Sequence, residues 1–240
     1  MIIVNEIRLP LEDGSDAAIQ KALALLRLSQ SDVRSVGLAK ISVDARHSKP
    51  YLVYTVAVQL ETLQAELAFG SFAPNVSIAN PRPFVLTHGK KRMRHRPIVC
   101  GLGPAGLFCA LILAREGYRP IVLERGAEMS QRIAAVNAFR LGGSLAPNAN
   151  IQFGEGGAGT FSDGKLTTRI RDPFCGYVTE TLLKHGAPPE IAIQQKPHIG
   201  TDKLVDVVRR VREQIVEAGG EVRFHTQVVG LRFAEGMLGG

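Results

Sequence analysis

Three glycines in the middle of the chain have the spacing of a phosphate-binding turn. Gly101, Gly103 and Gly106 follow the apolar residues Ile98 and Val99 in the order G-x-G-x-x-G. In a crossover that binds a dinucleotide, the first glycine permits the turn and the second lets the backbone approach a pyrophosphate. The third allows the following helix to pack closely against the strand. Such a turn also presents the N–H groups of a helix N-terminus to phosphates.

The residues around this turn predict a strand, a helix and a second strand. The helix has one apolar stripe at the spacing i, i+3, i+4, i+7, made by Leu107, Ala110, Leu111 and Ala114. The second strand, Ile121 to Leu123, ends at Glu124, where a carboxylate can accept hydrogen bonds from ribose hydroxyls. We therefore predict a dinucleotide site made by Gly101, Gly103, Pro104, Ala105, Gly106, Glu124 and Arg125. The alternative is a glycine-rich turn in an ordinary α/β unit, with a solvated Glu124.

Composition restricts the class of protein. The chain has 240 residues, 45% hydrophobic and 21% charged, as in an ordinary globular protein of one or two domains. It has no apolar run of the roughly 18 residues that span a bilayer. The first residues contain acids and no basic region, so we expect no signal peptide and no membrane partner. Three cysteines without paired spacing argue against a disulfide framework or a metal site, and we expect a cytoplasmic protein.

The formal net charge of +7 is concentrated in one short segment. Residues 89–96 form a basic linker that carries Lys90, Lys91, Arg92, Arg94 and Arg96. We interpret this linker as a solvated hinge, and the alternative is that its charges hold phosphates or contact nucleic acid. It has no aromatic residue on which bases could stack, which disfavours nucleic acid as a partner.

The sequence pattern of residues 1–88 predicts a separate small α+β domain of the ferredoxin-like type, whose elements follow one another along the chain as βαββαβ. An apolar stripe and a polar turn favour a helix with Ser15 as its N-cap. The expected elements are a strand Ile2–Leu9, a helix Asp16–Leu28, strands Val36–Ala45 and Tyr51–Gln59, a short helix Thr62–Phe69 and a closing strand Pro83–Leu86.

Beyond Glu124, a helix Ala127–Ala138 carries Arg132, which either reaches a phosphate or is an ordinary surface arginine. The next strong helix and strand come much later, at Asp202–Ala218, with Thr201 as its cap, and at Glu221–Val229. A long excursion therefore interrupts the doubly wound sheet. Such an organisation is typical of FAD domains, in which an inserted layer folds over the flavin.

A second glycine motif, FGEGGAGTFSDGKL, occupies residues 153–166. Glycine at this density indicates either a flexible linker or a binding loop. Phe153 and Phe161 bracket the glycines, which favours the binding loop because flexible linkers are poor in phenylalanine. Backbone N–H groups with the hydroxyls of Thr160 and Ser162 suit a flat ligand with polar edges.

The chain resembles a family of bacterial FAD-dependent dehydrogenases. The resemblance rests on the first glycine motif and on three further stretches, Phe153 to Ile170, Lys196 to Leu204 and Ser42 to Val56. The resemblance implies a Rossmann-type FAD-binding domain over residues 97–240. It further implies FAD bound by the first glycine motif and Glu124, with Gly156, Gly157, Thr160 and Ser162 near the flavin and the Val228 backbone beside the adenine. Flavoproteins of this type return to the cofactor through a late glycine-aspartate segment. We expect that such a segment lies beyond Gly240, which leaves the flavin domain incomplete.

The resemblance implies an oxidoreductase that acts on a small-molecule substrate, with NAD(P)H as a possible electron donor. Lys165 and His198 are the candidate catalytic residues, because they lie in the second motif and in KPHIG. The alternative for both is a solvated or turn position. Two other functions remain open, a flavin- or dinucleotide-binding module without turnover and a flavoprotein that acts on nucleic acid.

Overall fold

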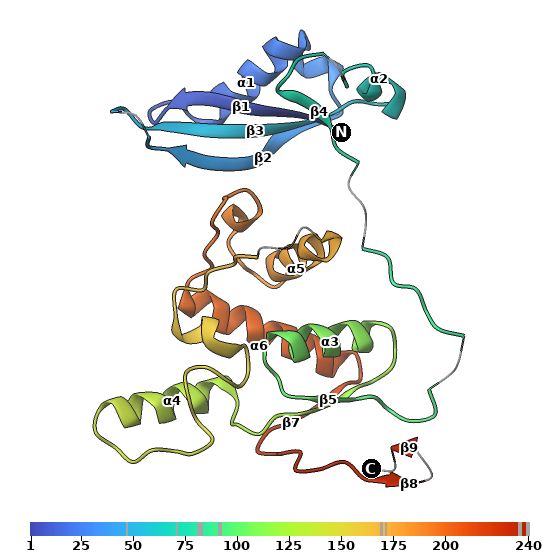
Figure 1. The fold of residues 1–240 in the computed structure, drawn as a ribbon, viewed down its shortest axis with the longest axis vertical. Helices are drawn as coiled ribbons and strands as arrows, with labels where there is room; N and C mark the ends of the chain where they lie inside the picture. The colour runs from blue at the N-terminus through green and yellow to red at the C-terminus, as the bar shows by residue number, and fades with distance from the viewer. Residues whose placement is uncertain are drawn as a thin grey trace. The chain divides into compact units, whose positions relative to one another are not determined.

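The computed structural model describes residues 1–46, 48–70, 72–80, 84–90, 93–168, 170, 172–234 and 237–238 (Figure 1). Its contacts divide the chain into two compact units. The first contains Met1–Val85, Thr167–Glu180 and Pro188–Pro197, and the second contains Leu86–Leu166, Thr181–Ala187 and His198–Gly240. The expected boundary at residue 88 is close to the division after Val85, but the two later segments of the first unit were not expected there.

The first unit is built on a four-stranded antiparallel sheet. Its strands are β1 (Ile2–Pro10), β2 (Ser35–Asp44), β3 (Tyr51–Gln59) and β4 (Val76–Ile78), in the order β2-β3-β1-β4. Among residues 1–85 of this unit, the described helices are α1 (Ser15–Leu26), α2 (Leu63–Leu67) and the 3-10 turn Gln30–Asp32. One face of α1 packs on the sheet, and both contribute to a core that includes Ile2, Val4, Ala22, Leu26, Val56 and Val58. The first three strands are confirmed to within one or two residues.

Two predictions for the first unit are wrong. Residues 84–86 form no strand, and Pro83 lies outside the described residues. The fourth strand is instead β4, whose three residues pair with Ile2 to Val4 and are too few to show periodicity. The N-cap of α1 is Gly14, which offers no side-chain acceptor, and Ser15 begins the helix.

The second unit contains a three-stranded parallel sheet. Strands β5 (Ile98–Cys100), β6 (Ile121–Leu123) and β7 (Glu221–Arg223) lie in the order β5-β6-β7. Helices α3 (Pro104–Arg115) and α6 (Thr201–Glu217) contact each other and this sheet, as Figure 1 shows. Val99 and Val122 lie side by side and are buried, as are the stripes of both helices. The strand, helix and strand around the first glycine motif are confirmed, and so is the long excursion before the next strand.

The excursion contains α4 (Met129–Arg140), the 3-10 turns Gly157–Phe161 and Pro189–Ala192, and α5 (Pro173–Lys184), which sequence patterns missed. A short hairpin, β8 (Phe233–Ala234) and β9 (Met237–Leu238), follows β7. No helix in the described ranges is both long and apolar enough to cross a membrane.

The expected strand Glu221–Val229 is too long, because only its first three residues pair with β6. His225 has a φ of +53°, and the chain bends there. The N–H groups of His225 and Thr226 then donate to the carbonyls of Gly126 and Glu124, so the chain crosses the end of β6. Thr201 is the first residue of α6 rather than its cap, and Gly200 holds the N-cap position.

Candidate functional site

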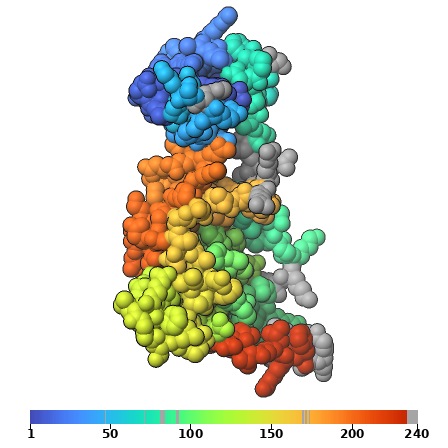
Figure 2. All heavy atoms as spheres, turned by 60° about the vertical axis from the view of Figure 1, so that its left-hand side comes forward, coloured from blue at the N-terminus to red at the C-terminus, as the bar shows by residue number. Residues whose placement is uncertain are grey.

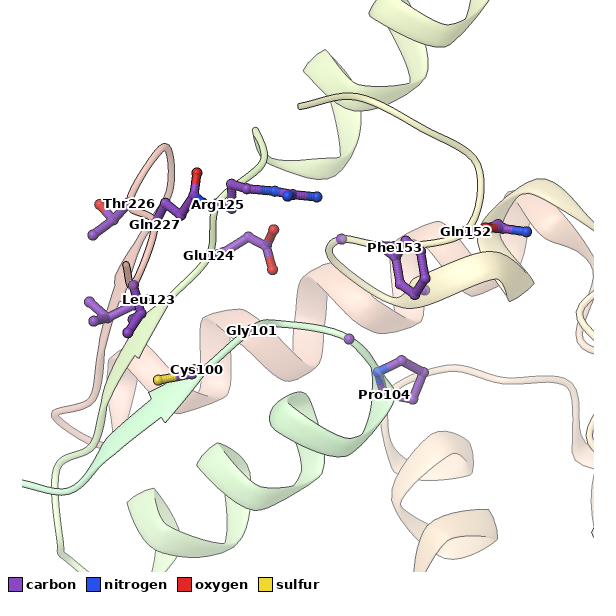
Figure 3. Close-up of a pocket in the computed structure, with 14 residues that line it drawn as sticks. Cys100, Gly101, Pro104, Leu123, Glu124, Arg125, Gln152, Phe153, Thr226 and Gln227 are labelled. Carbon is purple, nitrogen blue, oxygen red and sulfur yellow. The ribbon is translucent and has the colours of Figure 1, made fainter. Parts of the chain in front are cut away.

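A cleft of about 450 Å³ opens at the carboxyl ends of β5 and β6 (Figure 3). Four stretches that are separate in the sequence meet there: the turn after β5, residues 123–125, residues 152–157 and residues 226–228. The carboxyl ends of parallel strands are the usual place for a ligand in an α/β sheet. The lining residues are Cys100, Gly101, Gly103, Pro104, Leu123, Glu124, Arg125, Gln152, Phe153, Gly154, Gly157, Thr226, Gln227 and Val228.

The three glycines of the first motif differ in what requires them. Gly101 has a φ of +91°, a conformation that favours glycine. At Gly106 a Cβ atom would lie 2.0 Å from the carbonyl oxygen of Gly101, so the close approach of helix and turn excludes any side chain. At Gly103 the φ is −66°, and a Cβ would meet only the carbonyl oxygen of Gly154 at 4.0 Å. The protein itself therefore does not require glycine at position 103, whereas a ligand that approaches the backbone there would.

Glu124 faces the turn from the end of β6, as Figure 3 shows. One carboxylate oxygen, Oε2, accepts a hydrogen bond from the N–H of Leu102 at 2.7 Å. The other, Oε1, accepts from the N–H of Gly126 at 2.8 Å, and the residue is only 6% exposed. Because a carboxylate oxygen can accept more than one hydrogen bond, both oxygens still have acceptor capacity for a ligand hydroxyl.

The second glycine motif forms a wall of the same cleft, through Gly154 and Gly157. The N–H of Gly156 donates to the carbonyl of Leu102 at 3.0 Å, which ties the two glycine motifs together. A Cβ at Gly157 would lie 2.8 Å from the ring of Pro104. The motif is thus a packed turn against the first motif, in contact with the start of α3.

The predicted binding residues fall into two groups. Seven of them line the cleft: Gly101, Gly103, Pro104, Glu124, Arg125, Gly157 and Val228. The other six, Ala105, Gly106, Arg132, Gly156, Thr160 and Ser162, do not. Thr160 is buried and donates to the carbonyl of Gly157 at 2.8 Å, whereas Ser162 is exposed. The other seven lining residues were not among the predicted binding residues: Cys100, Leu123, Gln152, Phe153, Gly154, Thr226 and Gln227.

Arg132 lies behind the second motif and is only 2% exposed. Its Nε donates to the carbonyl of Asn150 at 2.9 Å, and its Nη1 donates to the carbonyl of Glu155 at 2.8 Å. Both terminal nitrogens lie 3.3 Å from the carbonyl oxygen of Gly157, and the guanidinium stacks over the ring of Phe161. Burial lowers the pKa of Arg132, although nearby carboxylates oppose that shift. Arg132 therefore holds the loop in shape and does not reach into the cleft.

Glu155 is a buried carboxylate that sequence reasoning did not single out. It accepts hydrogen bonds from the N–H of Met129 at 2.6 Å and from the Nε of Arg212 at 2.6 Å. These bonds connect the second motif to the N-terminus of α4 and to α6, and in Figure 2 the yellow-green surface of α4 adjoins the yellow loop. Burial raises the pKa of Glu155, and the attraction of Arg212 opposes that shift. The signal in the sequence was an acid placed between two glycines, Gly154 and Gly156.

Lys165 and His198 lie outside the cleft, but the structure brings them together. They face each other in an isolated antiparallel bridge, and the N–H of Ile199 donates to the carbonyl of Gly164 at 3.1 Å. An oxygen of Asp163 lies 2.9 Å from the Nζ of Lys165 and 3.8 Å from the Nδ1 of His198. The hydrogen bond from Lys165 lowers the pKa of Asp163. Within the described ranges, no group of three or more histidines, cysteines and acids could hold a metal ion.

Comparison with known proteins yields two similarities. Residues 1–59, which lie in the first unit, match a family described as "Domain of unknown function (DUF8436)". The chain is also 39% identical over 239 residues to an uncharacterized protein of Clostridium beijerinckii. The match covers 99% of this chain and 45% of that relative. The chain therefore spans less than half the length of the curated relative that it matches.

Proposed function

We propose that the second unit is a Rossmann-type domain that binds FAD, and that the chain is part of an FAD-dependent oxidoreductase acting on a small molecule. The observation that carries this proposal is the open position beside Gly103. It lies at the N-terminus of α3, in a cleft that also contains the carboxylate of Glu124. A diphosphate that carries a ribose needs this combination of bare backbone, helix N-terminus and acid.

Each part of the cleft suits one part of the ligand. The N-terminus of α3 favours the pyrophosphate, and Glu124 accepts hydrogen bonds from the ribose hydroxyls. Val228 and Arg125 line the cleft and would contact the adenine, Val228 through its backbone and Arg125 through its side chain. The second motif would contact the flavin side through Gly157, because Gly156, Thr160 and Ser162 do not line the cleft. The sheet order β5-β6-β7 matches one half of a Rossmann-type fold.

The catalytic chemistry would come from the cofactor. FAD supplies hydride or electron transfer, while the protein orients the reactants. NAD(P)H is the electron donor that we propose, and Lys165 and His198 are the substrate-side candidates. The first unit, whose strand order β2-β3-β1-β4 supports the ferredoxin-like fold that we propose for it, would accompany this domain in the longer enzyme.

Gly103→Asp is the substitution that tests the cleft most directly. Aspartate is a good N-cap and its charge suits a helix N-terminus, so α3 should be kept. Its side chain would, however, fill the open position and repel a diphosphate. Calorimetric titration should show FAD binding to the 240-residue chain and at least about tenfold weaker binding to the variant. Gly103→Ser, a small N-cap, is the matched control and should bind FAD more tightly than Gly103→Asp.

Because the chain spans less than half of its relative, we expect weak binding, in the range that titration with about 1 mM FAD detects. No heat of binding at that concentration would overturn the FAD assignment. Turnover is tested on the longer relative loaded with FAD, to which NADH or NADPH is added without oxygen. Bleaching of the flavin absorbance, reversed by an electron acceptor, supports the oxidoreductase. Bound flavin that neither donor reduces would favour a module without turnover.

A further inference from the structure

A second cavity, of about 540 Å³, lies at the amino ends of the parallel strands, whereas the cleft lies at their carboxyl ends. Arg96 precedes β5 and Arg119 precedes β6, so both residues lie at the amino ends of the strands. Lys90 and Arg94 of the basic linker and the half-buried Tyr118 also line this cavity. Lys91 and Arg92 of the linker lie outside the described residues. We call this space, lined by Lys90, Arg94, Arg96, Tyr118 and Arg119, the basic cavity.

Hydrogen bonds hold His88 and Arg96, which flank the described cations Lys90 and Arg94, against other parts of the second unit. The Nε of Arg96 donates to the carbonyl of Arg119 at 2.7 Å, and its Nη1 donates to Glu221 at 3.1 Å. At the other end of this segment, the Nε2 of His88 lies 2.7 Å from a carboxylate oxygen of Glu116. The cations of the linker are therefore arranged on a wall and are not spread along a free chain.

The positive charge in this cavity exceeds what the surrounding structure neutralises. Four of its lining residues are lysine or arginine, and Glu116 is the one carboxylate among the described lining residues. Within the described part of the chain, Lys90, Arg94 and Arg119 form no ion pair. The end of α3 contributes about half a negative charge, which is too little to balance them. Cations that line one cavity repel one another where they lie within the Debye length of about 8 Å at physiological salt.

We propose that the basic cavity binds a small ligand with two or more phosphate groups. Arginine presents a planar fork of donors that matches phosphate oxygens, and several cations in one concave space favour a compact polyanion. The volume lies in the range of small-molecule sites. Tyr118 adds one aromatic ring to the lining, so the phosphates belong either to an inorganic oligophosphate or to a nucleotide whose base stacks on that ring. A single aromatic residue disfavours a nucleic-acid strand, which needs a series of stacking positions. This proposal does not depend on FAD binding.

The test is calorimetric titration of the 240-residue chain with inorganic triphosphate and with ATP. Lys90→Glu/Arg94→Glu reverses two exposed cations of the cavity and should weaken both titrations at least about tenfold. Arg119→Gln removes a third cation from another wall and should weaken them less. Arg140→Glu/Lys203→Glu reverses two exposed cations away from the cavity, with the same change in net charge, and should bind like the parent. Gly103→Asp, which obstructs the cleft, should also bind triphosphate like the parent.

The two ligands separate the two phosphate sources. ATP that binds more tightly than triphosphate indicates a nucleotide with its base on Tyr118, and equal affinities indicate the phosphates alone. The proposal is overturned if triphosphate does not bind, or if the control pair weakens it as much as Lys90→Glu/Arg94→Glu. If Gly103→Asp loses triphosphate binding and the cavity variants keep it, the phosphates bind in the cleft and not in the basic cavity. A single-stranded RNA that binds far more tightly than triphosphate, through Lys90 and Arg94, would replace the small ligand with nucleic acid.

Discussion

The carboxylate of Glu124 and the backbone N–H of Leu102 form a hydrogen bond of 2.7 Å between the end of β6 and the turn after β5. This bond fixes the acid against the backbone that would hold the pyrophosphate. The same side chain therefore has two roles, since it stabilises the turn and supplies acceptors to the cleft. Any test of the ligand assignment must separate the effect on binding from the effect on the turn.

Replacement of Glu124 by alanine should weaken FAD binding far more than replacement of Lys165. Glu124→Ala removes the ribose acceptor and leaves the N–H groups of Leu102 and Gly126 without their partner, at a cost to stability of about 1–3 kcal/mol each. Glu124→Gln keeps an acceptor oxygen for one N–H and should recover part of the stability but little of the binding. Lys165→Ala, outside the cleft, is the control. FAD titration and urea unfolding measure the two effects, and equal flavin occupancy in Glu124→Ala and parent would contradict the ribose assignment.

The same change, glycine to alanine, should destabilise the protein at one position of the first motif and have little effect at another. Gly106→Ala places a Cβ 2.0 Å from the carbonyl oxygen of Gly101, so the helix must move. We expect a loss of about 1–3 kcal/mol, as for other overpacked sites. Gly103→Ala has room and an ordinary φ, and its stability should stay within about 1 kcal/mol of the parent. Thermal unfolding compares the two. A Gly106→Ala protein as stable as Gly103→Ala would show that the close approach does not constrain the motif.

Sequence patterns predicted the elements that are determined by residues close together in the sequence. The turn at Gly101 and the stripe of Leu107 and Leu111 depend on backbone conformation and helical period, and both appear where expected. The end of β7 was not predictable, since it depends on His225 bending to bond the carbonyl of Gly126, a contact distant in sequence. The strand β4 was missed because three residues carry no period.

The candidate site follows the same division. Spacing alone identified Gly103 and Glu124, which line the cleft. Spacing could not assign a role to Arg132, because the sequence pattern of an arginine on a helix is the same whether the side chain faces solvent, a ligand or a buried loop. Only the fold shows that the carbonyls of Asn150, Glu155 and Gly157 converge on that guanidinium. Buried charge of this kind depends on contacts distant in sequence.

Arg132 should be the most sensitive residue of α4. Arg132→Leu removes the donor that the loop carbonyls share and leaves them buried, so we expect a loss of about 3–5 kcal/mol. Arg132→Lys should not restore stability, because an ammonium cannot reach three carbonyls from fixed directions. Arg140→Leu, on the exposed end of the same helix, is the control. Urea unfolding gives the stability, and hydrogen exchange of residues 153–161 reports the loop. A loop that stays protected in Arg132→Leu would contradict the role assigned to the guanidinium.

Arg212→Gln should make stability depend more strongly on pH. Burial raises the folded-state pKa of Glu155 above its ordinary value of 4.5, and Arg212 opposes that rise. A carboxyl with a raised pKa binds more protons in the folded state than in the unfolded state. Its contribution to stability is therefore fully present below pH 4.5 and falls as pH rises through the folded pKa. Removal of Arg212 raises the folded-state pKa of Glu155 further. Stability is therefore lost over a wider range of pH.

The measurement is the free energy of unfolding in urea at acidic and at mildly alkaline pH. The loss between the two should be larger in Arg212→Gln than in the parent, with a slope of up to about 1.4 kcal/mol per pH unit inside the window. Contacts of Arg212 that do not titrate cancel in this difference. Arg209→Gln is the matched control, since Arg209 is exposed and pairs with Asp206. If both variants follow the parent's pH dependence, Glu155 is not the group that Arg212 holds ionised in the buried loop.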